Sequence, residues 1–367
     1  MRFQECKDVL AQLDRSCIAN APPIWLGIGK NRIKVLCAEP LNSELRGYFC
    51  HAIAEPGPTD AVVEVLEGQN LMSSPDWVNW ARDPGKSGRK DAIHDLEDGR
   101  LVGKVRTGVT FLQSPQAIIA FGPCAQNSNQ IVNFINTQFL NMSLRDGWQI
   151  CHAAAITNGT QTLAIAGLSG GGKSTSVLRL MELSALKFMT NDRLLARAGQ
   201  PFPDALGIPK EPRINPGTIL HNPRLRGMLS EQRLAELSEM AGDELWHLEE
   251  KYDLIISDVF GAGRVQYDAP LTDFWVLNWN RESTEATRLI DVDLATRPDL
   301  LSAIMKSPGP FYQKTDGSFS RDTDQCSEAD YLQALRGVRA REVTGRIDFD
   351  TIFEEGKALF ETGGQEQ

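Results

Sequence analysis

Long apolar runs, paired cysteines and an excess of basic residues are all missing from this 367-residue sequence. No stretch reaches about 18 consecutive apolar residues, so no membrane span is expected. The seven cysteines are scattered without a C-x-x-C pair, which argues against both a zinc site and a disulfide framework. Residues 1–17 carry three carboxylates and lack the apolar run of a secretory signal. We therefore expect a cytoplasmic protein without a membrane partner.

Basic residues are outnumbered, with 38 Lys and Arg against 48 Asp and Glu and a formal net charge of -10. A general nucleic-acid binder needs a basic surface to displace counterions, so we expect no nucleic-acid partner. A small basic pocket for phosphate stays compatible with this balance. The composition, 41% hydrophobic and 23% charged, is that of an ordinary globular protein, and the length suggests two domains or one large domain.

Several catalytic signatures are absent as well. The sequence has no nucleophile elbow of the Ser/His/Asp enzymes and no glycine fingerprint for dinucleotides. The H-R-D and D-F-G motifs of protein kinases are missing too. These absences exclude the common hydrolase, dehydrogenase and protein-kinase patterns.

One phosphate-binding motif is complete, because G-x-x-x-x-G-K-[ST] matches Gly167 to Ser174 without exception. In such a loop, backbone N–H groups face one point and the following helix adds its positive end. Lys173 is expected to reach the β- and γ-phosphates, and the Ser174 hydroxyl is expected to bind Mg²⁺. We therefore predict ATP and Mg²⁺ as cofactors. The predicted nucleotide ligands are Gly167, Ser169, Gly170, Gly171, Gly172, Lys173, Ser174 and Thr175.

The motif lies in a strand–loop–helix–strand context, which indicates an α/β fold. QTLAIAG reads as the strand before the loop, a helix is expected from Lys173 to about Leu183, and KFMTND reads as the next strand. Further strands are predicted at DLIISDVF and FWVLNW. Helices are predicted over residues 128–146 and around 292–306, 328–339 and 348–361. The N-terminal part is predicted to hold a short helix over 2–18, strands over 23–70 and a surface excursion over 73–100.

From about residue 150 to 280 the chain resembles HPr kinase/phosphorylase and the wider phosphoenolpyruvate-carboxykinase-like kinases. The likeness rests on His152 before the loop, on GLSGGGKST itself, on Asn191-Asp192, and on IISDVFGAGRV at residues 255–265, followed by FWVLNW. The stretches NQIVNFIN, CHAAAI and MTNDRLL look like the HPr-kinase-related "kinase B" group, and with them the resemblance covers most of the chain. It implies a phosphoenolpyruvate-carboxykinase-like P-loop kinase domain.

The resemblance also implies roles for particular residues. Asp192 would bind Mg²⁺ and take the proton from the acceptor hydroxyl. His152 would lie near the transferred phosphate, although a lone His on an apolar strand can equally be a core residue. Arg264 would steady transition-state charge. A basic residue of the Gly207–Ile214 segment, Lys210 or Arg213, would point toward the triphosphate. The prolines of this segment could equally mark an ordinary loop.

Two departures from the HPr kinases leave the mechanism open. Asn191 stands where those kinases have a first aspartate, and Gln266 stands where they have an arginine. Either Asp192 both binds Mg²⁺ and accepts the proton, or the base lies elsewhere, or the protein is a poor catalyst. We therefore do not expect HPr itself to be the substrate.

The resulting prediction is an ATP- and Mg²⁺-dependent kinase that phosphorylates a hydroxyl of an unidentified small molecule or protein serine. The alternative is a catalytically weak ATP-binding switch that regulates a partner protein. Residues 1–120 would form a strand-rich N-terminal region, 121–350 the HPr-kinase-like domain, and 351–367 a C-terminal helix and tail. A homo-oligomer is suggested by the hexamers of HPr kinases, but the sequence does not settle the state.

Overall fold

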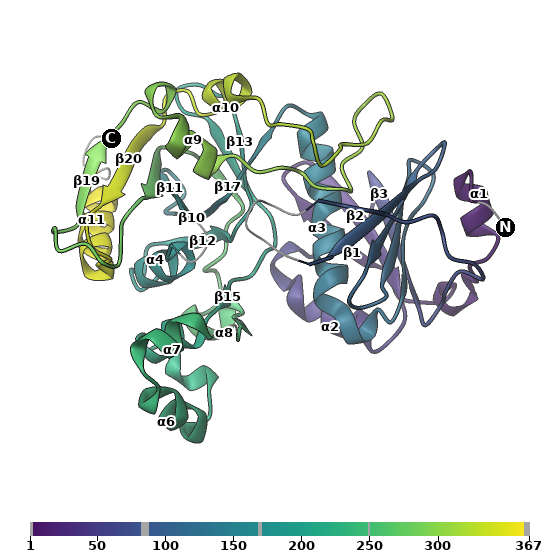
Figure 1. Cartoon of the computed structure of the whole chain (residues 1–367), viewed down its shortest axis with the longest axis horizontal. Helices are drawn as coiled ribbons and strands as arrows, with labels where there is room; N and C mark the ends of the chain where they lie inside the picture. Colours follow the sequence, from purple (N-terminus) through teal and green to yellow (C-terminus); the bar gives the residue numbers. More distant parts are fainter. Residues whose placement is uncertain (1–2, 82–87, 168–170, 249, 363–367) are drawn as a thin grey trace. The chain divides into compact units, whose positions relative to one another are not determined.

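The computed structural model describes residues 3–81, 88–167, 171–248 and 250–362. The chain divides into two compact units (Figure 1). Unit 1 comprises Met1–Gly147 and Ser307–Cys326, and unit 2 comprises Trp148–Lys306 and Ser327–Gln367. The first boundary lies later than the predicted residue 120, because helix α3 (Ser128–Arg145) packs on the strands of unit 1. Residues from 351 onward belong to unit 2.

Unit 1 is built on an eight-stranded sheet of order β1-β2-β3-β8-β7-β6-β5-β4. β2, β3 and β8 are parallel neighbours, and the other pairs are antiparallel. The strands are β1 (Ile24–Ile28), β2 (Asn31–Cys37), β3 (Ala61–Glu67), β4 (Val78–Asn79), β5 (Asp91–Asp95), β6 (Arg100–Lys104), β7 (Thr110–Gln113) and β8 (Ile118–Gly122). The helices are α1 (Cys6–Leu10), α2 (Leu41–Tyr48) and α3.

Helix α3 follows from its sequence pattern. Its apolar residues recur at helical spacing, and Ile131, Phe134, Ile135 and Phe139 are almost fully buried. The helix contacts β2 and β3 and thus covers the parallel part of the sheet. The predicted helix over 128–146 is confirmed.

One expectation about unit 1 was wrong, because the predicted surface excursion over 73–100 contains β4 and β5. The strands predicted within 23–70 are confirmed as β1, β2 and β3, with α2 between the second and the third. β5 has the sequence DAIHD, which shows no clear alternation, yet it pairs along its whole length with β6. An ion pair of 2.5 Å between Asp91 and Lys104 joins the two strands. The prediction looked for alternating apolar residues and therefore missed β5.

Unit 2 contains a six-stranded mixed sheet of order β12-β10-β11-β18-β20-β19. β11, β18 and β20 are parallel, whereas β10 runs antiparallel to both β11 and β12. The strands are β10 (Ala153–Thr157), β11 (Thr162–Gly167), β12 (Lys187–Thr190), β18 (Asp273–Leu277), β19 (Arg288–Asp291) and β20 (Arg339–Thr344). Helix α4 (Lys173–Leu180) follows β11 after the glycine loop, which confirms the predicted strand–loop–helix–strand order.

Two smaller sheets complete unit 2. One has the order β17-β14-β13-β9, and the other pairs β15 with β16. Their strands are β9 (Gln149–Cys151), β13 (Leu194–Arg197), β14 (Asp204–Gly207), β17 (Asp268–Pro270), β15 (Arg213–Ile214) and β16 (Tyr252–Asp253). The predicted continuous strand WQICHAAAIT is therefore split at His152 between β9 and β10, which belong to different sheets. The chain as a whole is a mixed α/β protein.

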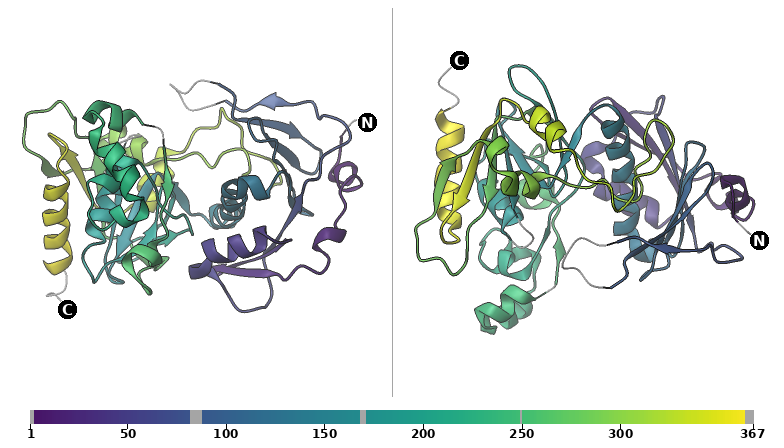
Figure 2. Two further views of the ribbon diagram at one scale, coloured as in Figure 1. Left: turned by 90° about the horizontal axis from the view of Figure 1, so that it is seen from below. Right: turned by 45° about the horizontal axis from the view of Figure 1, so that its top comes forward.

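The core of unit 2 lies between the six-stranded sheet and two helices. Val177 and Leu180 of α4 and Ile352 of α11 (Phe349–Thr362) pack on Ile165 and Trp275 of the sheet. α11, the yellow helix of Figure 2, packs along α4. The other helices are α5 (Pro216–Leu220), α6 (Glu231–Glu239), α7 (Gly242–His247), α8 (Ile256–Phe260), α9 (Pro298–Ile304) and α10 (Glu328–Ala334). No helix in the described part of the chain is both long and apolar enough to cross a bilayer.

Two segments of unit 2 differ from the prediction. DLIISDVF contains the last residue of β16 and the helix α8, and Gly261 follows the helix with φ +93. Its apolar run is as compatible with a buried helix as with a strand, because both can be apolar on all sides. The predicted helix over 328–339 ends earlier, and residues from Arg339 form β20 beside β18.

Candidate nucleotide site

Three chain segments meet at one edge of the six-stranded sheet. β11 ends at Gly167 and β12 ends at Thr190, whereas β10 begins at Ala153. Because β10 is antiparallel to both neighbours, the residue before its start lies at the edge where they finish. His152, the glycine loop and the pair Asn191-Asp192 are therefore brought to this edge by strand pairing.

The glycine loop leads directly into α4. Three of its residues lie outside the described part of the chain, namely Leu168, Ser169 and Gly170. Gly172 precedes the helix with φ +91, a conformation that favours glycine. The Nζ of Lys173 donates a 2.9 Å hydrogen bond to the carbonyl oxygen of Gly167, so this side chain folds back toward the strand. Burial lowers the pKa of Lys173.

Ser174 contacts Asn191, not Asp192. Its Oγ donates a 2.9 Å hydrogen bond to Oδ1 of Asn191. Hydroxyl and amide oxygens are ligands that suit Mg²⁺, so this pair fits a metal that also binds phosphate oxygens. The described residues contain no cluster of three or more His, Cys, Asp or Glu side chains that could hold a metal. Thr175, another predicted ligand, has its Oγ1 3.0 Å from Oγ1 of Thr218 on α5.

Asp192 lies between two cationic or ionisable partners. Its Oδ1 is 3.0 Å from Nε2 of His152, and its Oδ2 is 3.2 Å from Nζ of Lys306. Its φ of +70 is unusual for a residue other than glycine and turns the chain sharply after β12. Burial raises the pKa of Asp192, but the His152 hydrogen bond and the Lys306 charge outweigh it and hold the pKa well below its usual range. The carboxyl group is therefore ionised at neutral pH.

The tautomer of His152 follows from this contact. The hydrogen bond to Asp192 raises the pKa of His152, but burial and the charges of Lys306 and Lys173 outweigh it, so the net pKa is lowered. The imidazole is thus mainly neutral at pH 7. Since a carboxylate only accepts hydrogen bonds, Nε2 carries the proton and Nδ1 keeps its lone pair.

Four cations interact electrostatically with Asp192, and they are Lys173, Arg193, Lys210 and Lys306. Burial, together with Arg193, lowers the pKa of Lys210 to about 8. The backbone N–H of Asn191 donates a 3.2 Å hydrogen bond to the carbonyl of Lys210, which ties the two segments together. In a protein with a net charge of -10, this local excess of positive charge fits a polyanion such as a triphosphate.

Lys306 was missed by sequence reasoning. It follows α9 by two residues, in a stretch without a recognisable motif. It reaches the site because Met305 forms a bridge with Cys151, and because the N–H of His152 donates to the carbonyl of Ile304 over 2.7 Å. No signal in a single sequence indicates such a pairing.

Arg264 lies at the other end of α4 from the glycine loop. Its guanidinium donates hydrogen bonds of 2.6 to 2.9 Å to the carbonyl oxygens of Met181, Leu183 and Leu186. These residues follow the C-terminal end of α4, whereas Lys173 begins the helix. Eight helical residues span about 12 Å. The contacts give Arg264 a helix-capping position, and we assign it no catalytic role.

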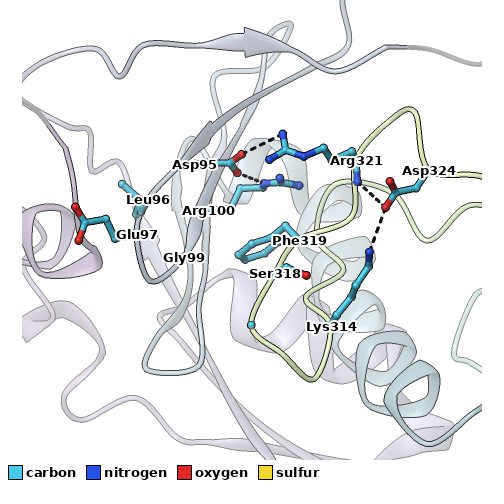
Figure 3. A pocket seen from close by; sticks show the side chains of 11 residues that line it. Asp95, Leu96, Glu97, Gly99, Arg100, Lys314, Ser318, Phe319, Arg321 and Asp324 are labelled. Atoms are coloured by element: carbon cyan, nitrogen blue, oxygen red, sulfur yellow. Dashed lines mark hydrogen bonds and ion pairs between the residues drawn. The ribbon is translucent and has the colours of Figure 1, made fainter.

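Unit 1 has a pocket of about 380 Å³ of its own (Figure 3). Five of its charged groups are paired with one another: Arg100 and Arg321 lie by Asp95, and Lys314 lies by Asp324. Nη1 of the buried Arg100 also donates to two carbonyl oxygens of the 307–326 segment. This arrangement holds that segment on β6, and we assign the pocket no ligand.

Comparison with known proteins finds similarity among solved structures. No protein-family model matches the chain, and no curated protein matches it either. Among solved structures, the HPr(Ser) kinase/phosphatase from Coxiella burnetii aligns with 11% identity and a TM-score of 0.28. The alignment covers 58% of this chain and 99% of that chain. A TM-score this low does not establish a shared fold, so the functional argument below rests on the site itself.

Proposed function

We propose that this chain is an ATP- and Mg²⁺-dependent phosphotransferase, with a phosphoenolpyruvate-carboxykinase-like P-loop kinase domain related to the HPr kinases. It would transfer the γ-phosphate of ATP to a hydroxyl of a small molecule or of a protein serine. The observation that carries the proposal is the convergence of the P-loop, the Ser174–Asn191 oxygen pair and the Asp192 group at one edge of the sheet. The acidic balance of the chain argues against a nucleic-acid acceptor, and a cytoplasmic location fits its cysteines, none of which forms a disulfide.

Each residue of the site has a role in this reaction. Lys173 exchanges the Gly167 carbonyl for phosphate oxygens, and the N–H groups at the start of α4 face the same ligand. Ser174 and Asn191, together with the Asp192 carboxylate, would hold Mg²⁺, and the ion would neutralise negative charge on the nucleotide. Lys306 and Lys210 add positive charge where it develops on the transferred group. Catalysis is then mainly positioning and charge neutralisation.

Two groups are placed to take the proton from the acceptor hydroxyl. Asp192 is ionised and can accept the proton directly. His152 is neutral, with an unprotonated Nδ1, and Asp192 stabilises the imidazolium that forms when Nδ1 accepts a proton. Both routes need the Asp192 carboxylate. Asn191 is an amide and takes no part in proton transfer.

The test of nucleotide binding is Lys173→Ala. The variant should weaken Mg-ATP binding by about 10- to 100-fold, the effect of losing a hydrogen bond between charged groups. Lys187→Ala is the matched control, because Lys187 begins β12 at its other end and bonds to Gln266. Titration calorimetry measures both, with thermal unfolding to confirm that the variants fold. An unchanged ATP affinity in folded Lys173→Ala contradicts the proposal.

The test of phosphoryl transfer is Asp192→Asn. This variant should abolish transfer from labelled ATP to acceptors in a cell extract, and it should lose Mg²⁺-dependent tightening, yet retain some metal-free ATP binding. Turnover at the wild-type rate would mean that Asp192 serves neither metal nor proton.

A second candidate function is a catalytically weak ATP-dependent switch that regulates a partner protein. Asn191 favours it, because a neutral amide stands beside Ser174 where a carboxylate would bind Mg²⁺ more tightly. Slow ATP hydrolysis that cell extract does not change would support the switch. Label transfer to an extract component that depends on Lys173 would support the phosphotransferase.

HPr itself is not the expected acceptor. Gln266, at the position of the HPr-kinase arginine, has a neutral amide, which accepts a hydrogen bond from Lys187 and donates one to the carbonyl of Asp268. Asn191 likewise removes one proton-shuttling carboxylate. Efficient phosphorylation of purified HPr, or efficient removal of its phosphate by inorganic phosphate, would contradict this expectation.

A further inference from the structure

Trp279 makes a direct contact with the backbone of the glycine loop. Its Nε1 donates a 2.9 Å hydrogen bond to the carbonyl oxygen of Gly171. The strand register accounts for this position, because β18 runs parallel to β11 and pairs Leu277 with Gly167. The chain after Leu277 and the loop after Gly167 therefore leave the sheet at the same edge, and the indole reaches across to the loop.

This hydrogen bond sets the direction of a peptide group. The Gly171–Gly172 peptide bond is trans, so its C=O and N–H point in opposite directions. With the carbonyl held by the indole, the N–H of Gly172 must point away from Trp279. This N–H belongs to the residue before α4, where loop N–H groups of a P-loop face the α- and β-phosphates.

Phe349 packs against the indole of Trp279. The rings of Trp279 and Phe349 pack edge to face, with centroids 5.3 Å apart at 87°. A Cβ on Gly172 would lie 2.9 Å from Cε1 of Phe349 and 3.3 Å from Cζ2 of Trp279. Both rings therefore lie directly against the loop, and the second one comes from the first residue of α11, far along the chain.

We propose that Trp279 is a positioning residue for nucleotide binding, which orients the Gly171–Gly172 peptide so that the Gly172 N–H donates to the β-phosphate. This inference rests on the proposed function. It assigns the residue no contact with substrate. The indole acts only through the peptide whose carbonyl it holds.

Two variants test this role. Trp279→Phe keeps an aromatic ring and removes the N–H donor. A second variant carries 3-benzothienylalanine at position 279, which places sulfur at the site of the N–H and preserves the shape of the ring. Trp148→Phe is the matched control. Trp148 lies in the same unit, immediately before β9, and its ring packs against the guanidinium of Arg197.

Titration calorimetry with Mg-ADP and with AMP supplies the readout, since AMP lacks the β-phosphate. Both variants at position 279 should bind Mg-ADP about 3- to 10-fold more weakly, the loss of one net hydrogen bond, with AMP affinity within about twofold of wild type. The control should match wild type for both ligands. If Trp279→Phe does not fold, the benzothienylalanine variant decides.

Unchanged Mg-ADP affinity in the benzothienylalanine variant overturns the inference, and so does an equal loss for Mg-ADP and AMP. In both cases the wild-type protein still binds nucleotide, so the proposed function stands. A wild-type protein that binds neither ATP nor ADP overturns the proposed function and this inference with it.

Discussion

Nζ of Lys306 lies 3.2 Å from Oδ2 of Asp192, although the two residues are 114 positions apart. The backbone around Lys306 is fixed by Tyr331, whose hydroxyl accepts a 3.1 Å hydrogen bond from the Lys306 N–H and donates to the carbonyl of Ile150. Asp192 is thereby held by a cation that the fold itself positions.

Lys306→Met should lower phosphoryl transfer by about 10- to 100-fold, the effect of losing one hydrogen bond to a charged group. The expected loss is in kcat more than in KM for ATP, because the charge acts where negative charge develops. Initial rates of label transfer from ATP to acceptors in a cell extract, measured over a range of ATP concentrations, give the split. Lys314→Met serves as control, since Lys314 pairs with Asp324 in unit 1. Wild-type kcat in Lys306→Met would show that the charge of Lys306 does not act on the transferred phosphate.

The titration of His152 offers a second prediction. Its pKa should lie below the ordinary value of 6.5, and Lys306→Met should raise it, because a nearby positive charge disfavours the imidazolium. Asp192→Asn should lower it further, since the hydrogen bond that favours the charged form is lost. Nuclear magnetic resonance of the five histidines measures these values, and His152→Asn identifies the signal. A pKa that Lys306→Met leaves unchanged would contradict the electrostatic description of the site.

Asn191→Asp should strengthen Mg²⁺ binding. The new carboxylate would face the Ser174 hydroxyl, where the amide oxygen now accepts its hydrogen bond, and a charged oxygen is a stronger ligand for a hard cation. We expect a lower Mg²⁺ requirement for ATP binding and faster ATP hydrolysis without an acceptor. Mg²⁺ titrations at fixed ATP measure the first effect. If neither quantity changes, position 191 does not face the metal.

Glu211 predicts a pH dependence of stability. Burial raises the pKa of this nearly inaccessible carboxyl from 4.5 to about 7. A hydrogen bond from the backbone N–H of Ile256 acts in the opposite direction and lowers the pKa. Between these two values the folded state binds more protons than the unfolded state, so the free energy of unfolding falls as pH rises. The loss across this window is about 3 kcal/mol, from roughly 1.4 kcal/mol per pKa unit.

Glu211→Gln should remove this loss, because the amide still accepts the hydrogen bond and never ionises. Its stability relative to wild type should therefore grow between pH 5 and pH 8 in chemical denaturation, because proton binding and unfolding are thermodynamically linked. Glu231→Gln, at the exposed start of α6, is the control and should show no such trend. A constant difference between Glu211→Gln and wild type across this range would contradict the assignment.

The part of the site that could be predicted is local in sequence. LAIAG is a continuous apolar run, the glycines after it permit a tight turn, and STSVLRLMEL has helical spacing, so β11, the loop and α4 were predictable. The same holds for α3, whose apolar stripe is long. The strand predicted at DLIISDVF was wrong because a short apolar run has no period that separates a buried helix from a strand. β20 was not predicted because its partner β18 lies more than sixty positions earlier in the chain.

The sequence by itself determined the glycine loop, its Lys173 and Ser174, and the α/β order around them, since these depend on propensities and spacings within about twenty residues. Only the tertiary structure decided which oxygen faces Ser174, which cation holds Asp192 and which indole orients the loop. Asn191, Lys306 and Trp279 reach the site through strand pairing and chain turns. The physical reason is that hydrogen bonds and ion pairs act over about 3 Å in space, whatever the separation along the chain.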